Sequence, residues 1–326
     1  MPRPSGRPVP ARTSVEPGTL RALRAEPDPD RRREGLGALL RSGHGAQVAG
    51  AAELAADRGI TELRPALLAA WDRLYVEAER LDPTCAGKAG CALALHALDH
   101  PDRAPFVRGA THIQMQPMWP RPEDVAPPLR AACVHALATF GGVEALLVIA
   151  VALADPHEAV RAAAARGLAF AGEPAAAAMA LQLLRSPEPD HGVIADALAA
   201  FASLRPREAA AEAERVLSTA SEPREVAVLL ALGQARVDSL FPLLDRRVAP
   251  DNRPDVRRAA IVALGLSRST EARNRLLGLV REAALRDATD AIAALASLSQ
   301  SAALRAEVAG VAAGRGLESA IEAAFG

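Results

Sequence analysis

The sequence has few aromatic residues, few cysteines and no long apolar run, and each shortage excludes a class of protein. Aromatic residues make up 3% of the chain although 50% of the residues are hydrophobic, so alanine, leucine and valine supply most of the apolar mass. Alanine has the highest helix propensity, and its small side chain lets helices pack closely. The composition therefore favours stacked helices over a β-sheet.

Cysteines and apolar segments together indicate the compartment. The three cysteines, Cys85, Cys91 and Cys133, are too few and odd in number for a disulfide framework, which suggests a reducing compartment. No stretch approaches the ~20 uncharged apolar residues that cross a membrane. The first 30 residues also lack the apolar core of a signal peptide. We therefore predict a cytoplasmic protein without a membrane-spanning segment.

Charge is balanced overall but uneven along the chain. The net charge is -1, so the total charge does not attract nucleic acid or a membrane surface. Residues 1–33, however, contain eight arginines against four acidic residues, hence a net charge of +4. Prolines are frequent in residues 1–30 and lack the backbone donor that a helix needs. We predict that residues 1–30 form a disordered, basic, proline-rich arm.

A short motif repeats through the second part of the chain. An alanine-leucine or glycine-leucine pair recurs every 30 to 34 residues, with its leucine at Leu137, Leu168, Leu198, Leu232, Leu264 and Leu295. This period is typical of helix-hairpin solenoids, because one hairpin cannot bury its own apolar face and must stack on the next. We therefore predict an all-α fold, an α-solenoid (superhelix) of stacked antiparallel helix pairs.

Three of the repeats share an arginine seven residues before the leucine, namely Arg130, Arg161 and Arg257. The run Asp-Pro-His-Glu-Ala-Val-Arg at 155–161 and the run Asp-Val-Arg-Arg-Ala-Ala at 255–260 resemble the second helix of a HEAT repeat of the phycobilisome-lyase-like kind. This resemblance implies HEAT-like repeats over 127–326 and degenerate helical repeats over 31–126. We expect each repeated arginine to contact an aspartate or a backbone carbonyl of its own repeat.

The period breaks once, within residues 111–128. This segment has five prolines and one of the two tryptophans, Trp119. It is similar to a His-x-Gln-x-x-Pro-x-Trp loop in bacterial HEAT-repeat proteins of uncharacterised function, a likeness that implies no activity. We predict an irregular loop here, which either covers a helix face as a plug or projects from the array as a binding element.

HEAT-like arrays serve as scaffolds, adaptors, regulators and, in some cases, enzymes, so the resemblance implies little about chemistry. We predict a scaffold or regulatory module that binds a protein partner on its concave face, without catalysis and without a cofactor. The candidate contact residues lie in the irregular segment: His112, Gln116, Trp119, Arg121 and Asp124. The oligomeric state stays open at this point.

Two alternatives belong to other classes. A HEAT-like DNA glycosylase would use an arginine-lined groove, an aromatic residue such as Trp119 and a carboxylate such as Asp124, although the acidic balance after residue 33 disfavours nucleic acid. A metal-dependent enzyme or sensor would draw its ligands from Cys85, Cys91, His96, His100 and His112. These five lack the paired spacing of known metal motifs, so we predict no metal.

Overall fold

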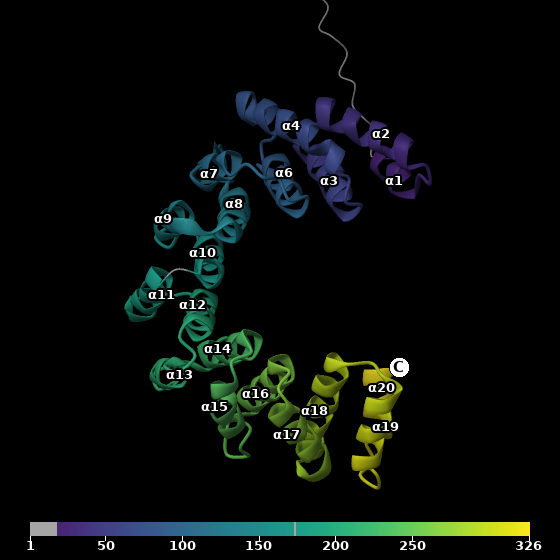
Figure 1. The fold of residues 1–326 in the computed structure, drawn as a ribbon, viewed down its shortest axis with the longest axis vertical. Helices are drawn as coiled ribbons and strands as arrows, with labels where there is room; N and C mark the ends of the chain where they lie inside the picture. The colour runs from purple at the N-terminus through teal and green to yellow at the C-terminus, as the bar shows by residue number, and fades with distance from the viewer. Residues whose placement is uncertain (1–17, 173) are drawn as a thin grey trace, which may run out of the picture. The chain divides into compact units, whose positions relative to one another are not determined.

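The computed structural model describes residues 18–172 and 174–326, whose regular secondary structure is almost entirely helical (Figure 1). They form two compact units: unit 1 ends at Ala136 and unit 2 begins at Leu137. The boundary falls inside helix α8 (Pro127–Phe140). None of the described helices is long and apolar enough to cross a membrane. The predicted all-α class is confirmed.

The prediction of a disordered arm is wrong over residues 18–30. Two helices lie here, α1 (Gly18–Ala25) and α2 (Pro29–Ser42). Pro29 stands in the first turn of α2, where a missing backbone N–H costs nothing. The Asp28 carboxylate accepts hydrogen bonds from the backbone N–H groups of Asp30 and Arg31, which caps the helix. The prolines thus separate two helices instead of preventing them. Residues 1–17 of the predicted arm lie outside the described residues.

Stacked helices make up most of unit 1. They are α3 (Gly45–Asp57), the short 3-10 turn η1 (Thr61–Leu63), α4 (Arg64–Val76), α5 (Ala78–Leu81), α6 (Ala86–Ala97) and α7 (Ala104–Ala110). Helix α3 packs along α6, and α2 packs along α4. Trp71 of α4 and Phe106 of α7 are both fully buried, so two large aromatic side chains help to fill this core.

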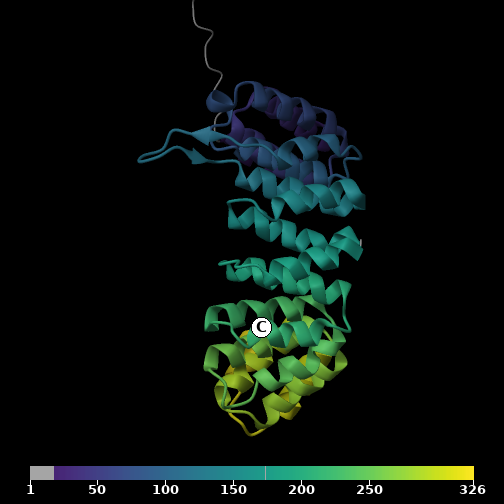
Figure 2. The same cartoon turned by 90° about the vertical axis from the view of Figure 1, so that its left-hand side faces the viewer.

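The segment after α7 is a β-hairpin, so the prediction of an irregular loop at 111–128 is wrong in this respect. Strand β1 (Met115–Gln116) pairs antiparallel with β2 (Glu123–Asp124), and Met115 lies opposite Asp124. Figure 2 shows the hairpin extending away from the helices of unit 1. Pro117, Pro120 and Pro122 all stand in the connecting turn, where no ladder donor is needed. In the sequence these prolines argue against a strand. In the structure they lie outside the paired residues and therefore do not prevent the pairing.

Unit 2 is a two-layer stack of helices (Figure 1). Five helices lie side by side in one layer: α10 (Glu158–Ala171), α12 (His191–Leu204), α14 (Glu222–Ala235), α16 (Pro254–Ser267) and α18 (Leu285–Leu298). Their partners are α9 (Gly142–Ala152), α11 (Pro174–Arg185), α13 (Ala209–Leu217), η2 (Asp238–Leu240) with α15 (Phe241–Arg247), and α17 (Thr270–Glu282). Helices α19 (Ala302–Val311) and α20 (Glu318–Phe325) follow at the C-terminus.

The leucine period of the sequence marks the core of this stack. All six repeat leucines lie on α8 or on the layer of α10, α12, α14, α16 and α18, and each is at most 1% exposed. The residue before each of these leucines is alanine or glycine, so the helices of this layer can approach one another closely. At Gly233 of α14, for example, an added Cβ atom would lie 2.6 Å from Cα of Ala263 on α16. The predicted α-solenoid of helix pairs is confirmed.

Candidate functional site

The first anchor of the hairpin is the buried side chain of Lys88, the only lysine of the chain. Lys88 lies on α6 and is 0% exposed. Its ammonium donates to Gln114 Oε1 at 2.6 Å and to the Leu74 carbonyl at 3.4 Å, and it lies 3.5 Å from Asp82 Oδ2. Gln114 Nε2 in turn donates to the Asp82 carbonyl at 2.8 Å. A buried ammonium needs such partners, so Lys88 fixes the residue that precedes β1.

The second anchor is an ion pair at the other end of the hairpin. Arg130 of α8 is 3% exposed and donates to Asp124 Oδ2 at 2.7 Å and to the His112 carbonyl at 2.9 Å. Asp124 Oδ1 accepts hydrogen bonds from the backbone N–H groups of Gln114 and Ala126. Burial alone would raise the pKa of Asp124, but these donors outweigh burial and lower it. The carboxylate therefore stays charged and ties both strands to α8.

The strand between these anchors has its apolar side chains on the outside. Ile113 and Met115 are 66% and 50% exposed, whereas Gln114 is 5% exposed. The apolar surface continues into the hairpin tip, defined here as residues 117–122, where Met118 is 55% and Trp119 is 95% exposed. Ordinary strands bury their apolar side chains and expose their polar ones. The hairpin thus presents four exposed apolar side chains to solvent from a fixed base.

The five predicted contact residues all lie on this hairpin, but the structure divides them. Trp119 and Arg121 are exposed at the tip. His112, Gln116 and Asp124 are half-buried at the base. The His112 ring lies edge-on to the Tyr75 ring, with 4.7 Å between the ring centroids, and burial lowers the pKa of His112, which favours the neutral imidazole. Two of the predicted residues are therefore available for contact, and three belong to the support.

The glycosylase alternative requires a carboxylate that is free to act next to an exposed aromatic residue. Asp124 is instead held by Arg130 and by two backbone N–H groups. It lies opposite Met115 in the strand ladder, whereas Trp119 lies in the turn. The arrangement gives Asp124 a positioning role in the hairpin and no sign of a catalytic one.

The proposed metal ligands do not meet. Among residues 18–172 and 174–326, no group of three histidine, cysteine, aspartate or glutamate side chains could hold a metal ion. Cys85 and Cys91 are buried, and burial raises the pKa of each thiol to about 12. A metal binds the thiolate, so these protonated thiols are poor ligands. The ligands of the metal alternative, Cys85, Cys91, His96, His100 and His112, therefore form no such group among the described residues.

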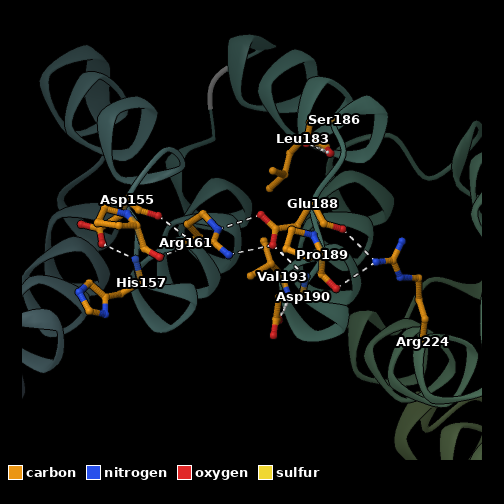
Figure 3. A network of polar contacts seen from close by, with 11 residues as sticks. Asp155, His157, Arg161, Leu183, Ser186, Glu188, Pro189, Asp190, Val193 and Arg224 are labelled. Carbon is orange, nitrogen blue, oxygen red and sulfur yellow. Dashed lines mark hydrogen bonds and ion pairs between the residues drawn. The ribbon is translucent and has the colours of Figure 1, made fainter. Parts of the chain in front are cut away.

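The repeated arginines of unit 2 join neighbouring repeats. Figure 3 shows Arg161 of α10, whose Nε and Nη2 atoms donate to the two carboxylate oxygens of Glu188 at 2.8 and 2.9 Å. Its Nη1 atom donates to the Asp155 carbonyl. On the other side, Arg224 of α14 donates to the carbonyl groups of Glu188 and Pro189. The turn before α12 is thus tied to the helices on both sides.

Arg257 of α16 repeats this arrangement. Its Nε atom donates to Asp287 of α18 at 3.1 Å, and its Nη1 atom donates to the Asn252 carbonyl at 2.7 Å. The predicted contact with a backbone carbonyl is confirmed for Arg161 and Arg257, but the carboxylate comes from the next repeat and not from the same one. These arginines therefore hold the stack together and are not contact residues.

Sequence reasoning missed an exposed apolar stripe on α9. Val143, Leu147 and Val151 are 65%, 63% and 71% exposed and lie four residues apart on one face of the helix. A groove beside this helix is lined by Ala150 of α9, by Leu153 just after it and by Met179 of α11, among others. The signal was present in the sequence, because α9 contains a single charged residue, Glu144.

Comparison with known families agrees with this architecture. Residues 122–202, which run from the end of the hairpin through α12, match the family model of HEAT repeats. HEAT repeats are generally scaffolds for protein interaction. No curated protein matches the chain.

Proposed function

We propose that this HEAT-repeat protein is a protein–protein interaction module, and that the hairpin at residues 111–128 is its contact element. HEAT repeats usually bind other proteins along stacked helices, which supports an interaction function in general. The hairpin interrupts such a stack, and interruptions of a regular array are common places for binding elements. The predicted site on the concave face stays a prediction.

The observation that carries this proposal is the reversed polarity of the hairpin. The tip exposes Trp119 almost completely, and Ile113 and Met115 extend the same apolar surface. Burying Trp119 inside unit 1 would have stabilised the fold, so its exposure makes sense if a partner covers it. Tryptophan and methionine are enriched at protein interfaces, and tryptophan is frequent among the residues that dominate binding energy.

The base explains how such a tip can bind tightly. Lys88 and Arg130 fix the two ends of the hairpin through buried hydrogen bonds. A contact element that is already fixed loses little conformational entropy when it binds, so more of its interaction energy appears as affinity. In the proposed complex Trp119 enters a pocket of the partner, and Arg121 contacts the rim of that interface. His112, Gln116 and Asp124 position the tip.

The test is affinity capture from native cell extract with the wild type, with Trp119→Ala and with a matched control. Leu285→Ala is the control, because Leu285 is also an exposed apolar residue, 57% accessible, but lies in unit 2. We expect the wild type and the control to retain the same partner and Trp119→Ala to lose it. Replacing Trp119 with a photo-crosslinking amino acid should then join the partner at this position.

Stability must be measured on the same proteins. Because Trp119 is exposed, we expect Trp119→Ala to change the free energy of unfolding by no more than about 0.5 kcal/mol. Equal capture by wild type and Trp119→Ala would refute the hairpin as the contact element. Unfolding of Trp119→Ala would show that the hairpin is a structural plug instead.

A further inference from the structure

Two neighbouring helices of unit 2 end in an unusual way. The residue after α14 is Arg236, with φ 52°, and the residue after α16 is Arg268, with φ 54°. Both lie in the left-handed region, which glycine adopts easily and arginine does not. Helix α10 ends with the same backbone conformation but uses Gly172. Arginine thus stands at two positions where glycine would cause no strain.

The fold gives no reason for these two side chains. Both are exposed, and neither makes a side-chain hydrogen bond or ion pair within the part of the chain that the structure describes. A cation near a helix C-terminus is favoured by the helix dipole, but a basic residue in the last turn would achieve this without a positive φ. Strained residues that the fold does not require are often functional.

The two arginines lie on one edge of unit 2. Helices α14 and α16 are nearly in backbone contact at Gly233 and Ala263, and Arg236 and Arg268 follow this contact region by a few residues. A third arginine extends the row, because Arg207 and Arg236 line the same surface hollow between the turn after α12 and the turn after α14. Arg207 is exposed and also makes no side-chain hydrogen bond or ion pair among the described residues.

Two further arginines on this edge are paired with carboxylates. Arg205 pairs with Glu208, and Arg273 pairs with Glu307. Asp238 lines the hollow together with Arg207 and Arg236, but it forms no ion pair with either one in the described structure. Among the described residues, the charged groups that form no ion pair at these turns are the three arginines and two exposed carboxylates, Asp238 and Glu271, which leaves a balance of +1.

We propose that Arg207, Arg236 and Arg268 form a docking edge for an acidic, extended segment of a partner protein. Helices that pack against one another lie about 8–10 Å apart, so arginines on successive turns recur at about that interval. An extended chain advances about 3.3 Å per residue. Carboxylates three residues apart would thus meet successive arginines. Arginine suits this role because its planar guanidinium can donate two hydrogen bonds to one carboxylate.

This edge is a second interaction surface and does not depend on the hairpin. The probe is a fluorescein-labelled peptide of alanine and glycine with an aspartate at every third position. A matched peptide has asparagine at those positions. Binding is followed by fluorescence anisotropy at low and at physiological salt. We expect the wild type to bind the aspartate peptide, more weakly at the higher salt concentration, and to ignore the asparagine peptide.

Three double variants separate charge from backbone strain. Arg236→Gly/Arg268→Gly should bind the aspartate peptide roughly tenfold more weakly, while its melting temperature stays the same or rises because glycine tolerates the positive φ. Arg236→Lys/Arg268→Lys should bind with an affinity between those of the wild type and the glycine variant, because lysine keeps the charge but cannot donate two parallel hydrogen bonds to one carboxylate. Arg281→Gln/Arg305→Gln, which changes two other exposed arginines of unit 2, should bind like the wild type. Trp119→Ala should also bind like the wild type, which separates this test from that of the hairpin.

The opposite results would overturn the proposal. Failure of the wild type to bind, equal binding of both peptides, or unchanged binding by the double glycine variant would each exclude an acidic docking edge. A fall in melting temperature of the glycine variant would show that the arginines serve the fold. Tighter binding of a single-stranded oligonucleotide than of the aspartate peptide would assign the edge to phosphate recognition instead.

Discussion

The two units use buried polar contacts in different ways. In unit 1 the basic side chains that anchor the hairpin are almost fully buried, with Lys88 0% and Arg130 3% exposed; Lys88 occurs once, whereas Arg130 occupies the repeat position of Arg161 and Arg257. In unit 2 the contacts of Arg161 with Glu188 and of Arg257 with Asp287 recur at the same repeat position. Their side chains are somewhat more accessible. The Lys88 network concentrates its contribution to stability in a few residues. The repeated arginine contacts distribute theirs along the stack.

The chain offers a simple way to measure the two units separately. Both tryptophans, Trp71 and Trp119, and the only tyrosine, Tyr75, lie in unit 1. Intrinsic fluorescence therefore reports the unfolding of unit 1, whereas circular dichroism at 222 nm reports the helices of both units. Because the units can unfold in separate steps, each variant below is followed with both probes.

The largest effect is expected from Lys88→Met. The substitution leaves Gln114 Oε1 without its donor and Asp82 without its cationic partner in a buried site. Removing one member of such a pair costs about 3–5 kcal/mol of unfolding free energy. The loss should appear in the tryptophan fluorescence transition in urea. Arg305→Met, at an exposed position of unit 2, is the matched control and should leave that transition unchanged.

A stability of Lys88→Met within about 0.5 kcal/mol of the wild type would contradict this account. It would mean that the cost of burying the Lys88 charge cancels the stabilisation from its partners, so that Lys88 does not anchor the hairpin. The contrast between the units would then disappear.

An intermediate effect is expected from Arg161→Ala in unit 2. The variant loses both hydrogen bonds to Glu188, whose carboxylate still accepts the backbone N–H of Asp190. Because that partner remains, we expect a loss of about 1–3 kcal/mol, seen by circular dichroism and not by fluorescence. Arg257→Ala should cost less, since its contacts with Asp287 are longer, 3.1 and 3.4 Å. If Arg257→Ala had the larger effect, the contacts Arg161–Glu188 and Arg257–Asp287 would not be equivalent.

The smallest expected effect is a difference between the two units in how their stability depends on pH. Burial lowers the pKa of His96, His100 and His112 in unit 1, so the folded unit favours the neutral imidazoles. Protonation below about pH 6.5, the unfolded value, therefore stabilises the unfolded state, and unit 1 should lose stability as the pH falls below that point. His112→Gln should reduce this dependence.

Unit 2 should behave differently over the same range. Burial alone would raise the pKa of Glu188 and Glu212, but the hydrogen bonds and charges of their donors together outweigh it and lower both pKa values. The stability that these two carboxylates contribute is lost only below about pH 4.5. Burial raises the pKa of Asp196 and Asp290, which acts in the opposite direction. Urea titrations from pH 8 to pH 4 should thus show the fluorescence transition moving before the transition of the remaining helices. Simultaneous movement of both transitions would contradict the assignment to the histidines.

Much of the fold could be predicted from the sequence because the repeat leucines are core residues. A leucine every 30 to 34 residues, flanked by alanine or glycine, specifies a helix that must be buried against similar neighbours. The helix at residues 18–25 and the start of the helix at residue 29 were missed because prolines suggest disorder in a sequence. Asp28 and Pro29 form a helix start in the structure.

The candidate site was only partly predictable. The broken period and the presence of Trp119 located the segment correctly, but the alternation Ile113-Gln114-Met115-Gln116 gives no indication of which face is buried. A period of two is compatible with either orientation. Lys88 decides the orientation, because its buried ammonium requires the Gln114 oxygen, and this partner lies 26 residues away in the chain.

The sequence by itself determined that the chain forms stacked helices, since helix propensity and apolar period are local properties. It also determined where the regular stack is interrupted. Only the tertiary structure decided that the interruption is a hairpin with its apolar side outward, and that the turn after α12 is held by helices on both sides. It also decided that Arg236 and Arg268 lie unpaired on one edge. These features depend on contacts between residues far apart in the chain, and the energy of a buried charge or an exposed tryptophan is set by what surrounds it.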